Sequence, residues 1–340
     1  MKKLISLFLV LALLLGVLAV PALAEGKTFG TLSYLNLTEQ DESELSMSVR
    51  RPMLKLLFLH GVMDGADEWL SEGANAFRYY DTMDAMLMAL QSGELDGIKV
   101  PYYTARYLCA TNDNLALRNE FHPENATGAA RIALNLLSDG YSFMMKEANT
   151  ELRDTFDAQI AAMKEDGTLQ KLIDEYILKA SEGGEPVAVT FEQFEGDPIK
   201  VAVTGSLPPM DYVAPDGSFA GFNTAMLAEI GKRLQKNIEL VQVDSIGRAL
   251  ALSEGTVDVV FWTRAMSENM AAVRRDDSVK LEDRVAESHA SMTDEERAIL
   301  DEAGLPDKET RDKSDARDIP EGTIITKPYF TDYPIMLFLK

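Results

Sequence analysis

Apolar and polar residues follow two periods along this chain, one typical of strands and one typical of helices. Short apolar or aromatic runs predict strands, and apolar residues three and four positions apart predict amphipathic helices. In the first half this pattern predicts strand, helix, strand, helix, strand over residues 27–39, 46–62, 76–82, 82–93 and 95–103. This order is typical of an open parallel α/β sheet.

The second half repeats the scheme. Strands are predicted at 197–205, 237–243 and 256–263, and helices at 223–234 and 245–255. The repeat predicts two related α/β lobes joined in one chain.

Other segments set the predicted boundaries. A strand at 141–146 followed by two helices closes the first half. Gly and Pro residues then mark a linker at 181–195, which predicts lobes at 25–180 and 196–340. The charged segment at about 266–322 is interpreted as a surface insertion with one short helix.

Two short segments of the chain have a similar pattern. MALQSGELDGI begins at Met88 and LALSEGTVDVV at Leu250, and both contain Ala, Leu, Gly and Asp at matching positions. The pattern predicts a helix that stops at Gly and leads directly into a buried strand. The shared residues Asp96 and Asp258 are predicted to accept backbone N–H groups at the strand start, with a ligand-binding role as the alternative.

The first residues predict export. Two lysines precede an apolar run at 4–20, and the segment that ends at Ala24 has the small-x-small pattern of a signal-peptidase site. We therefore expect a signal peptide at 1–24 and a periplasmic or extracellular protein. An uncleaved membrane anchor is the alternative. No cysteine follows the run, so lipid attachment there is not expected.

Composition restricts the chemistry further. With 55 acidic and 33 basic residues the net charge is −22, which argues against binding nucleic acid or anionic membranes. Cys109 is the single cysteine, so no intrachain disulfide can form. The three histidines have no partners at metal-ligand spacing, and neither a phosphate-binding loop nor a nucleophile elbow is present. We expect no cofactor, no metal and no enzymatic activity.

One stretch of the second half has a familiar pattern. Residues 199–260 contain a strand, Pro208-Pro209, an Asp-Gly turn and Gly221-Phe222 before a helix. This combination resembles the family 3 extracellular solute-binding proteins, the polar amino-acid receptors of ABC importers. Residues 141–177 resemble the family's closing strand and helices. The resemblance implies an α/β fold with two Rossmann-like lobes of periplasmic-binding-protein type II character. A domain of this family normally contains two lobes, but each half of this chain has room for only one, so we interpret each half as a reduced, single-lobe unit.

Candidate ligand-binding residues follow from the expected sheets. Ligands of open α/β sheets lie beyond the carboxyl ends of the strands. An amino acid needs a cation, usually Arg, for its carboxylate and an acid for its ammonium group, and an aromatic wall with backbone N–H groups completes such a site. The candidates are Met210, Asp211, Asn223, Trp262, Thr263, Arg264, Tyr34, Asn36, Tyr102 and Tyr103.

The resemblance also identifies departures at the site. The aromatic residues that flank the Pro-Pro pair in the family correspond to Leu207 and Met210, and the helical acid corresponds to Ala225. The carboxylate-binding Arg corresponds to Met270 or a neighbour, and Arg264 is close enough to replace it. The alternative to a ligand-binding role for Arg264 is that it is a solvated loop residue. The alternative for the candidate aromatic residues is that they pack in the core.

The sequence therefore favours a solute-binding component of an ABC importer, which takes up an amino acid or similar small polar solute and works with a membrane permease. A ligand-free sensory or interaction module, built from degenerate lobes, is the alternative. An enzyme is a third hypothesis, but no catalytic set supports it.

Overall fold

The structure is a computed structural model of the chain. It describes residues 27–32, 54–63, 76–117, 121–126, 130–131, 133–134, 138–184, 187–244, 247–264, 293–303 and 320–340. The expected signal peptide, the site candidates Tyr34 and Asn36, and most of the charged insertion lie outside the described residues.

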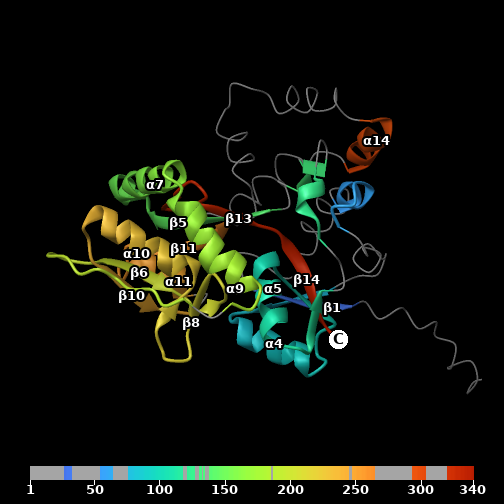
Figure 1. The fold of residues 1–340 in the computed structure, drawn as a ribbon, viewed down its shortest axis with the longest axis horizontal. Helices are drawn as coiled ribbons and strands as arrows, with labels where there is room; N and C mark the ends of the chain where they lie inside the picture. The colour runs from blue at the N-terminus through green and yellow to red at the C-terminus, as the bar shows by residue number, and fades with distance from the viewer. Residues whose placement is uncertain are drawn as a thin grey trace, which may run out of the picture.

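A mixed five-stranded sheet forms the first lobe (Figure 1). The two neighbours of its strand β1 both run parallel to it, as the β-α-β-α-β pattern predicts. The next two strands are antiparallel to their neighbours. The order across the sheet is β2 (Ala76–Tyr80), β1 (Thr28–Leu32), β3 (Gly97–Pro101), β14 (Pro334–Leu339) and β4 (Leu115–Leu117).

The second lobe contains a sheet with the same plan. Three parallel strands are again followed by one antiparallel strand and a short last strand. The order is β10 (Ile238–Gln242), β6 (Ile199–Val203), β11 (Val259–Arg264), β5 (Asp139–Lys146) and β12 (Thr323–Ile325), and β13 (Phe330–Asp332) also pairs with β5. The predicted α/β class with two lobes is confirmed.

Each half of the chain supplies the antiparallel strand of the other half's sheet. β5 precedes the predicted linker but pairs with β11, and β14 follows the linker but pairs with β3. Strand membership therefore differs from the predicted division into lobes at 25–180 and 196–340. The reason is that strand pairing is non-local, and local periodicity does not specify a partner. Figure 1 shows β14 passing from the region of β13 into the first lobe.

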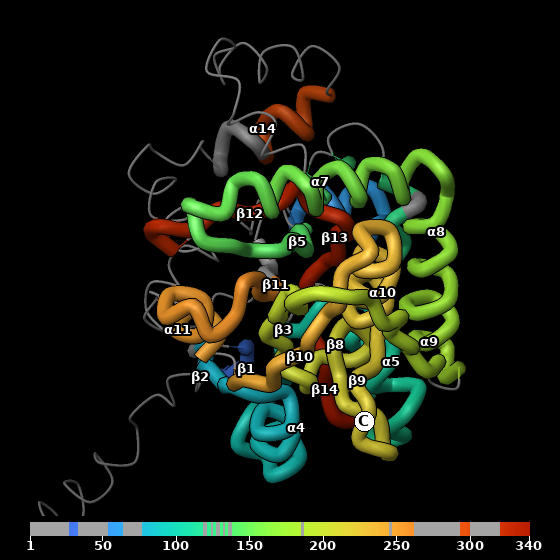
Figure 2. The backbone as a smooth tube through the Cα atoms, turned by 90° about the vertical axis from the view of Figure 1, so that its left-hand side faces the viewer, coloured from blue at the N-terminus to red at the C-terminus, as the bar shows by residue number. Residues whose placement is uncertain are grey.

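Helices cover both faces of the second sheet. Alternate residues of β5 face opposite sides: Phe143 packs in the core with α7 and α10, and Met144 packs with α11. Figure 2 shows α7, α8 and α9 in succession along one side of the molecule, and α9 contacts α5. The helices are α4 (Met83–Gln91), α5 (Tyr102–Thr111), α7 (Thr150–Glu165), α8 (Thr168–Ile173), α9 (Lys179–Ser181), α10 (Phe222–Leu234), α11 (Gly247–Glu254) and α14 (Asp294–Ala303).

Smaller elements connect these helices and strands. Residues 54–59 form a further helical segment. A π-helical turn, η3 (Asp174–Leu178), joins α8 to α9, so the second of the two helices predicted after the strand at 141–146 continues as a π-helix. The remaining elements are the 3₁₀ turns η1 (Pro123–Asn125) and η2 (Glu147–Asn149), and a small sheet of β7 (Ser206–Leu207), β8 (Asp211–Val213) and β9 (Phe219–Ala220).

The twin segments have the predicted structure. Gly93 and Gly255 end α4 and α11 with φ of 77° and 78°, a conformation that favours glycine. The Asp96 carboxylate accepts the N–H of Thr28 at 2.7 Å, and the Asp258 carboxylate accepts the N–H of Lys200 at 2.9 Å. Both Asp residues therefore fix the first residues of a neighbouring strand, which confirms the structural role.

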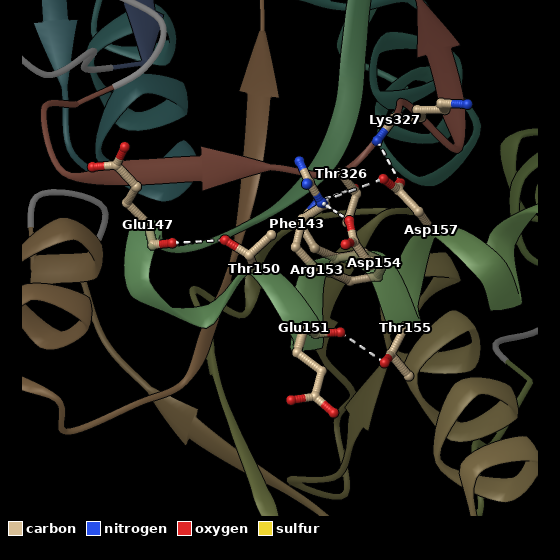
Figure 3. A network of polar contacts seen from close by, with 10 residues as sticks. All are labelled: Phe143, Glu147, Thr150, Glu151, Arg153, Asp154, Thr155, Asp157, Thr326 and Lys327. Atoms are coloured by element: carbon tan, nitrogen blue, oxygen red, sulfur yellow. Dashed lines mark hydrogen bonds and ion pairs between the residues drawn. The ribbon is translucent and has the colours of Figure 1, made fainter.

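The connection between β12 and β13 is tied to β5 and α7 (Figure 3). Thr326 exchanges two hydrogen bonds with Phe143: its hydroxyl accepts the Phe143 N–H at 3.0 Å, and its own N–H donates to the Phe143 carbonyl at 2.9 Å. The Asp157 carboxylate accepts the N–H of Lys327 at 2.7 Å and lies 3.7 Å from the Arg153 guanidinium. These bonds fix the segment that leads toward the first lobe.

One predicted strand ends earlier than expected. The aromatic pair Tyr102-Tyr103 was assigned to the strand before it, but both residues begin α5. Pro101 occupies the N-cap position, where its fixed φ and missing N–H are tolerated. Among the residues that the structure describes, no helix combines the length and apolar character needed to cross a membrane.

Candidate functional site

The loop that follows β6 folds back on a buried carboxylate. Asp211 accepts the N–H groups of Thr204 at 2.8 Å and Gly205 at 3.2 Å, and the Thr204 hydroxyl at 3.0 Å. Burial raises the pKa of Asp211 above its ordinary value, although these three hydrogen bonds favour the charged form. In this structure Asp211 closes the loop, and its contact with a solute stays a prediction.

Met210 and Asn223 connect this loop to α10 and to the segment before β13. Met210 is fully buried, and its carbonyl accepts the N–H of Asn223 at 2.8 Å. The side-chain oxygen of Asn223 accepts the hydroxyl of Tyr329 at 2.7 Å, and burial raises the pKa of Tyr329 well above its ordinary value. Both candidates therefore have structural partners here, and a ligand role for them stays a prediction.

Tyr102 and Tyr103 lie where α5 begins, at the carboxyl end of β3. The Tyr102 ring lies 4.9 Å from the ring of Phe121, and the Arg106 guanidinium lies 5.9 Å from the Tyr102 ring centre. Tyr103 packs against the core of the second lobe, with Phe330 at 5.9 Å between ring centroids. Both tyrosines keep part of their surface exposed, so a solute could reach them.

A buried carboxylate meets the same helix terminus. Asp332 is fully buried and accepts the N–H of Tyr103 at 3.1 Å and that of Tyr333 at 2.7 Å. Burial, with a smaller contribution from Asp139, raises the pKa of Asp332 to about 7. Burial and the charge of Asp332 also raise the pKa of Tyr103 to about 12.

The last three candidates of the second lobe belong to β11. Trp262, Thr263 and Arg264 lie in register with Ser142, Tyr141 and Gly140 of β5. Their backbone positions are described but their side chains are not, so their proposed contact with a solute stays a prediction. The structure therefore brings Trp262 to the carboxyl end of its sheet, as the sequence predicted.

The two lobes touch directly beside these loops. Tyr107 of α5 and Tyr212 of β8 lie 5.9 Å apart between ring centroids, with an angle of 46° between the rings. Leu207 packs against the hydrophobic cores of both lobes. α4 also contacts β7. The described surfaces between the lobes thus meet through aromatic and aliphatic side chains.

Sequence reasoning missed several residues of this region. Asp332, Tyr107 and Tyr212 occur in segments whose local pattern indicates only a strand or a helix. Asp332 meets Tyr103 and Tyr107 meets Tyr212 through contacts between distant parts of the chain, which local patterns do not specify. Arg248 had a local signal, since it is the single cation in the segment SIGRALALSEG. Its guanidinium donates to the carbonyl of Phe261 at 3.0 Å.

The described side chains of the region include no metal cluster and no activated thiol. Within the described ranges, no three His, Cys, Asp or Glu residues group closely enough to hold a metal ion. Cys109 is half-buried, and burial raises the pKa of its thiol, which makes the nucleophilic thiolate scarcer. The region offers aromatic surfaces, backbone amides and a guanidinium, which suit a small polar molecule.

Comparison with known proteins supports one resemblance. Residues 199–280 match the model of bacterial extracellular solute-binding proteins, family 3. The match confirms the resemblance predicted from residues 199–260, in the segment that supplies β6, β10 and β11. No curated protein sequence matches the chain.

Several solved structures align loosely with the chain. An ancestral arginine-binding protein bound to arginine has a TM-score of 0.34 at 10% identity, with 94% of this chain and 85% of that chain covered. The GluR0 ligand-binding core from Nostoc punctiforme with (L)-glutamate has a TM-score of 0.32 at 8% identity, with 92% and 84% covered. An arginine third transport system periplasmic binding protein from Legionella pneumophila has 0.30 at 11%, with 71% and 69% covered. With scores this low, the assignment of the fold depends on the sheet topology itself.

Proposed function

We propose that this chain, whose residues 199–280 match the family 3 solute-binding proteins, captures a small polar solute between its two lobes. That match is the observation that carries the proposal, since the matched segment builds the three parallel strands of the second sheet. The first sheet has the same strand plan, so in the proposal two similar lobes enclose the solute. Capture would proceed by closure of the two lobes around the solute.

An amino acid is the proposed solute, and an ABC importer is the proposed destination. The solute class follows from the family that the sequence resembles. The protein would act outside the cytoplasm after removal of residues 1–24 and would present the closed form to a membrane permease. Binding without chemical conversion is proposed, because no described cluster of side chains suggests a catalytic set.

The proposed contacts lie at the carboxyl ends of the strands. From the first lobe they are Tyr102 and Tyr103, which keep exposed surface, together with Tyr34 and Asn36. From the second lobe they are Trp262, Thr263 and Arg264. Met210, Asp211 and Asn223 are each no more than 3% exposed, so in the proposal they hold the binding loops in place.

A second function is supported by the contact between the lobes. Tyr107 meets Tyr212, and Leu207 packs on both cores, so the described lobe surfaces contact each other directly. This packing favours a ligand-free interaction module as the alternative.

Thermal unfolding and titration calorimetry of the full exported chain distinguish these functions. Each of the twenty L-amino acids would be added separately. A true solute at about one hundred times its Kd stabilises the protein by about 2.7 kcal/mol, which corresponds to a rise in Tm of roughly 4 °C for a chain of this length. No rise and no heat with any of them would contradict the binding function and support the module.

A pair of variants locates the binding. Tyr103→Leu keeps an apolar side chain but removes the aromatic face, and it should weaken binding at least tenfold. Lys232→Gln on α10 serves as the control, since Lys232 is exposed and pairs only at 3.4 Å with exposed Glu192. Unchanged affinity in Tyr103→Leu would place the solute elsewhere.

A further inference from the structure

We propose that the hinge between the two lobes responds to pH through two opposed carboxyl groups, those of Asp139 and Asp332. The lobes keep the packed arrangement of this structure while Asp332 carries a proton, and they part when it is ionised. The inference goes beyond the proposed function, since it concerns the motion of the lobes and holds without any solute.

Both residues lie where the chain crosses from one lobe to the other. Leu134 packs in the core of the first lobe, and β5 of the second sheet begins at Asp139. In the opposite direction, β13 of the second sheet ends at Asp332, and β14 of the first sheet begins at Pro334. Both crossings are short, so a change in the angle between the lobes must bend them.

The two crossings pair with each other at these residues. Asp332 lies opposite Asp139 in the antiparallel pairing of β13 with β5. Directly opposed side chains of an antiparallel pair lie on the same face, with Cβ atoms about 4.5–5.5 Å apart, and like charges there are destabilising. Two ionised carboxylates would therefore weaken the strand pairing that holds the lobes together.

Asp332 is also packed against the first lobe. It is fully buried and accepts the N–H of Tyr103 in α5 at 3.1 Å. Burial raises the pKa of Asp332 to about 7, and the charge of Asp139 adds to this shift, although backbone hydrogen bonds favour the charged form. Moving α5 away from β13 would expose the carboxylate to water and remove the cost of burying it. The parted lobes therefore bind this proton less tightly than the packed lobes.

Other charged and titratable groups surround Asp332. Besides Asp139 of β5 they are two tyrosines and an arginine of α5, the residue after Asp332, and an arginine that follows η1: Tyr102, Tyr103, Arg106, Tyr333 and Arg131. Burial is the main cause that raises the pKa of Tyr103 and that of Tyr333, so neither ionises near neutral pH. Both arginines stay charged throughout. The change of charge at the hinge thus comes from the carboxyl groups.

Distance measurements between spin labels in the two lobes test the inference. Met88 of α4 and Leu250 of α11 are 69% and 58% exposed, so labels on Met88→Cys and Leu250→Cys disturb little packing. The full exported chain is used without solute, and Cys109→Ser removes the native thiol. Between about pH 4 and pH 7 the ratio of parted to packed lobes should rise about tenfold per pH unit and then level off.

Three variants of the labelled protein identify the group responsible. Asp332→Asn cannot ionise, so its distances should not depend on pH. Asp139→Asn removes a charge that raises the pKa of Asp332, so the rise should level off at a lower pH. Asp258→Asn is the matched control and should keep the full pH dependence, since Asp258 also accepts a strand N–H, that of Lys200 at 2.9 Å, but within the second lobe.

The outcomes decide the inference independently of the proposed function. An unchanged distance from pH 4.5 to pH 8 would overturn it, and so would a pH dependence that persists in Asp332→Asn. If Asp332→Asn does not fold, Asp139→Asn decides, and a transition at unchanged pH counts against the inference. Circular dichroism lost together with the distance change would mean unfolding, which also counts against it. Because no amino acid is added, failure here leaves the proposed function intact, and a protein that binds no amino acid can still show the response to pH.

Discussion

The N–H of Tyr103 donates to the carboxylate of Asp332 at 3.1 Å, across 229 residues of sequence. Tyr103 begins α5 of the first lobe, and Asp332 ends β13 of the second sheet. Asp332 also lies in register with Asp139 of β5. The buried carboxyl group of Asp332 thus lies beside the start of β5 and the start of α5, where the two lobes meet.

This carboxyl group should make stability depend on pH. Its folded pKa of about 7 lies above the unfolded value near 3.8, so the folded state keeps the proton longer than the unfolded state. Stability from this group is fully present below about pH 4 and is lost as pH rises toward 7, by about 1.4 kcal/mol per pH unit. Urea unfolding from pH 4.5 to 7.5 should therefore show the unmodified protein losing stability relative to Asp332→Asn.

A second variant identifies the cause of that dependence. Asp139→Asn removes the neighbouring negative charge, which contributes to the raised pKa. The loss of stability should then end at a lower pH. Parallel stability curves for the unmodified protein and Asp332→Asn would contradict the assignment.

The close approach at Gly221 predicts a large effect of one added methyl group. A Cβ there would lie 2.7 Å from the carbonyl oxygens of Met210 and Pro209, at a φ of 102°. Gly217→Ala is a matched control, because its φ is 85° but nothing lies within 4 Å. We expect a loss of about 1 kcal/mol for Gly217→Ala and of at least about 3 kcal/mol for Gly221→Ala, measured by urea unfolding. Equal losses of stability would show that the loop containing Pro209 and Met210 shifts easily to accommodate the added methyl group.

The contact between Tyr107 and Tyr212 predicts coupling between the lobes. Tyr212→Ala should lower the free energy of unfolding by about 3 kcal/mol, and Tyr212→Phe, which keeps the ring, by less than about 1 kcal/mol. A double-mutant cycle with Tyr107→Ala should give a coupling of about 0.5–1.5 kcal/mol. A coupling of zero would mean that the lobes do not meet at these rings in solution.

The twin Asp residues predict matching effects in the two lobes. Asp96→Ala and Asp258→Ala should each reduce the free energy of unfolding by about 1 kcal/mol, because each removes an acceptor from a strand N–H. The sites lie in different sheets, so the losses should add in the double variant. A loss of stability in only one of the two variants would show that the two Asp residues do not contribute equally to stability.

Local signals in the sequence predicted most of the elements. The strands and helices around Gly93 and Gly255 follow from periodicity and turn chemistry, which act within a few residues. The aromatic pair Tyr102-Tyr103 misled the assignment, because its preference for strands was stronger than the helix-start signal of Pro101.

Tertiary arrangement could not be predicted in the same way. No property of β5 or β14 alone indicates the sheet that each joins. The burial of Met210, Asp211 and Asn223, and the approach of Asp332 to Tyr103, depend on that arrangement. The site was therefore predicted as a set of loops, but the contacts within it were not.

The exchange of strands between the halves also determines when the protein can complete its fold during synthesis. Ribosomes make β5 early, but its partners β11, β12 and β13 follow only after the linker, so a growing chain carries apolar residues such as Phe143 and Met144 beside an open strand edge. The first sheet waits still longer, until β14 is added between β3 and β4. Neither sheet can therefore be completed from one half of the chain alone, and both stay open until the last residues have been made.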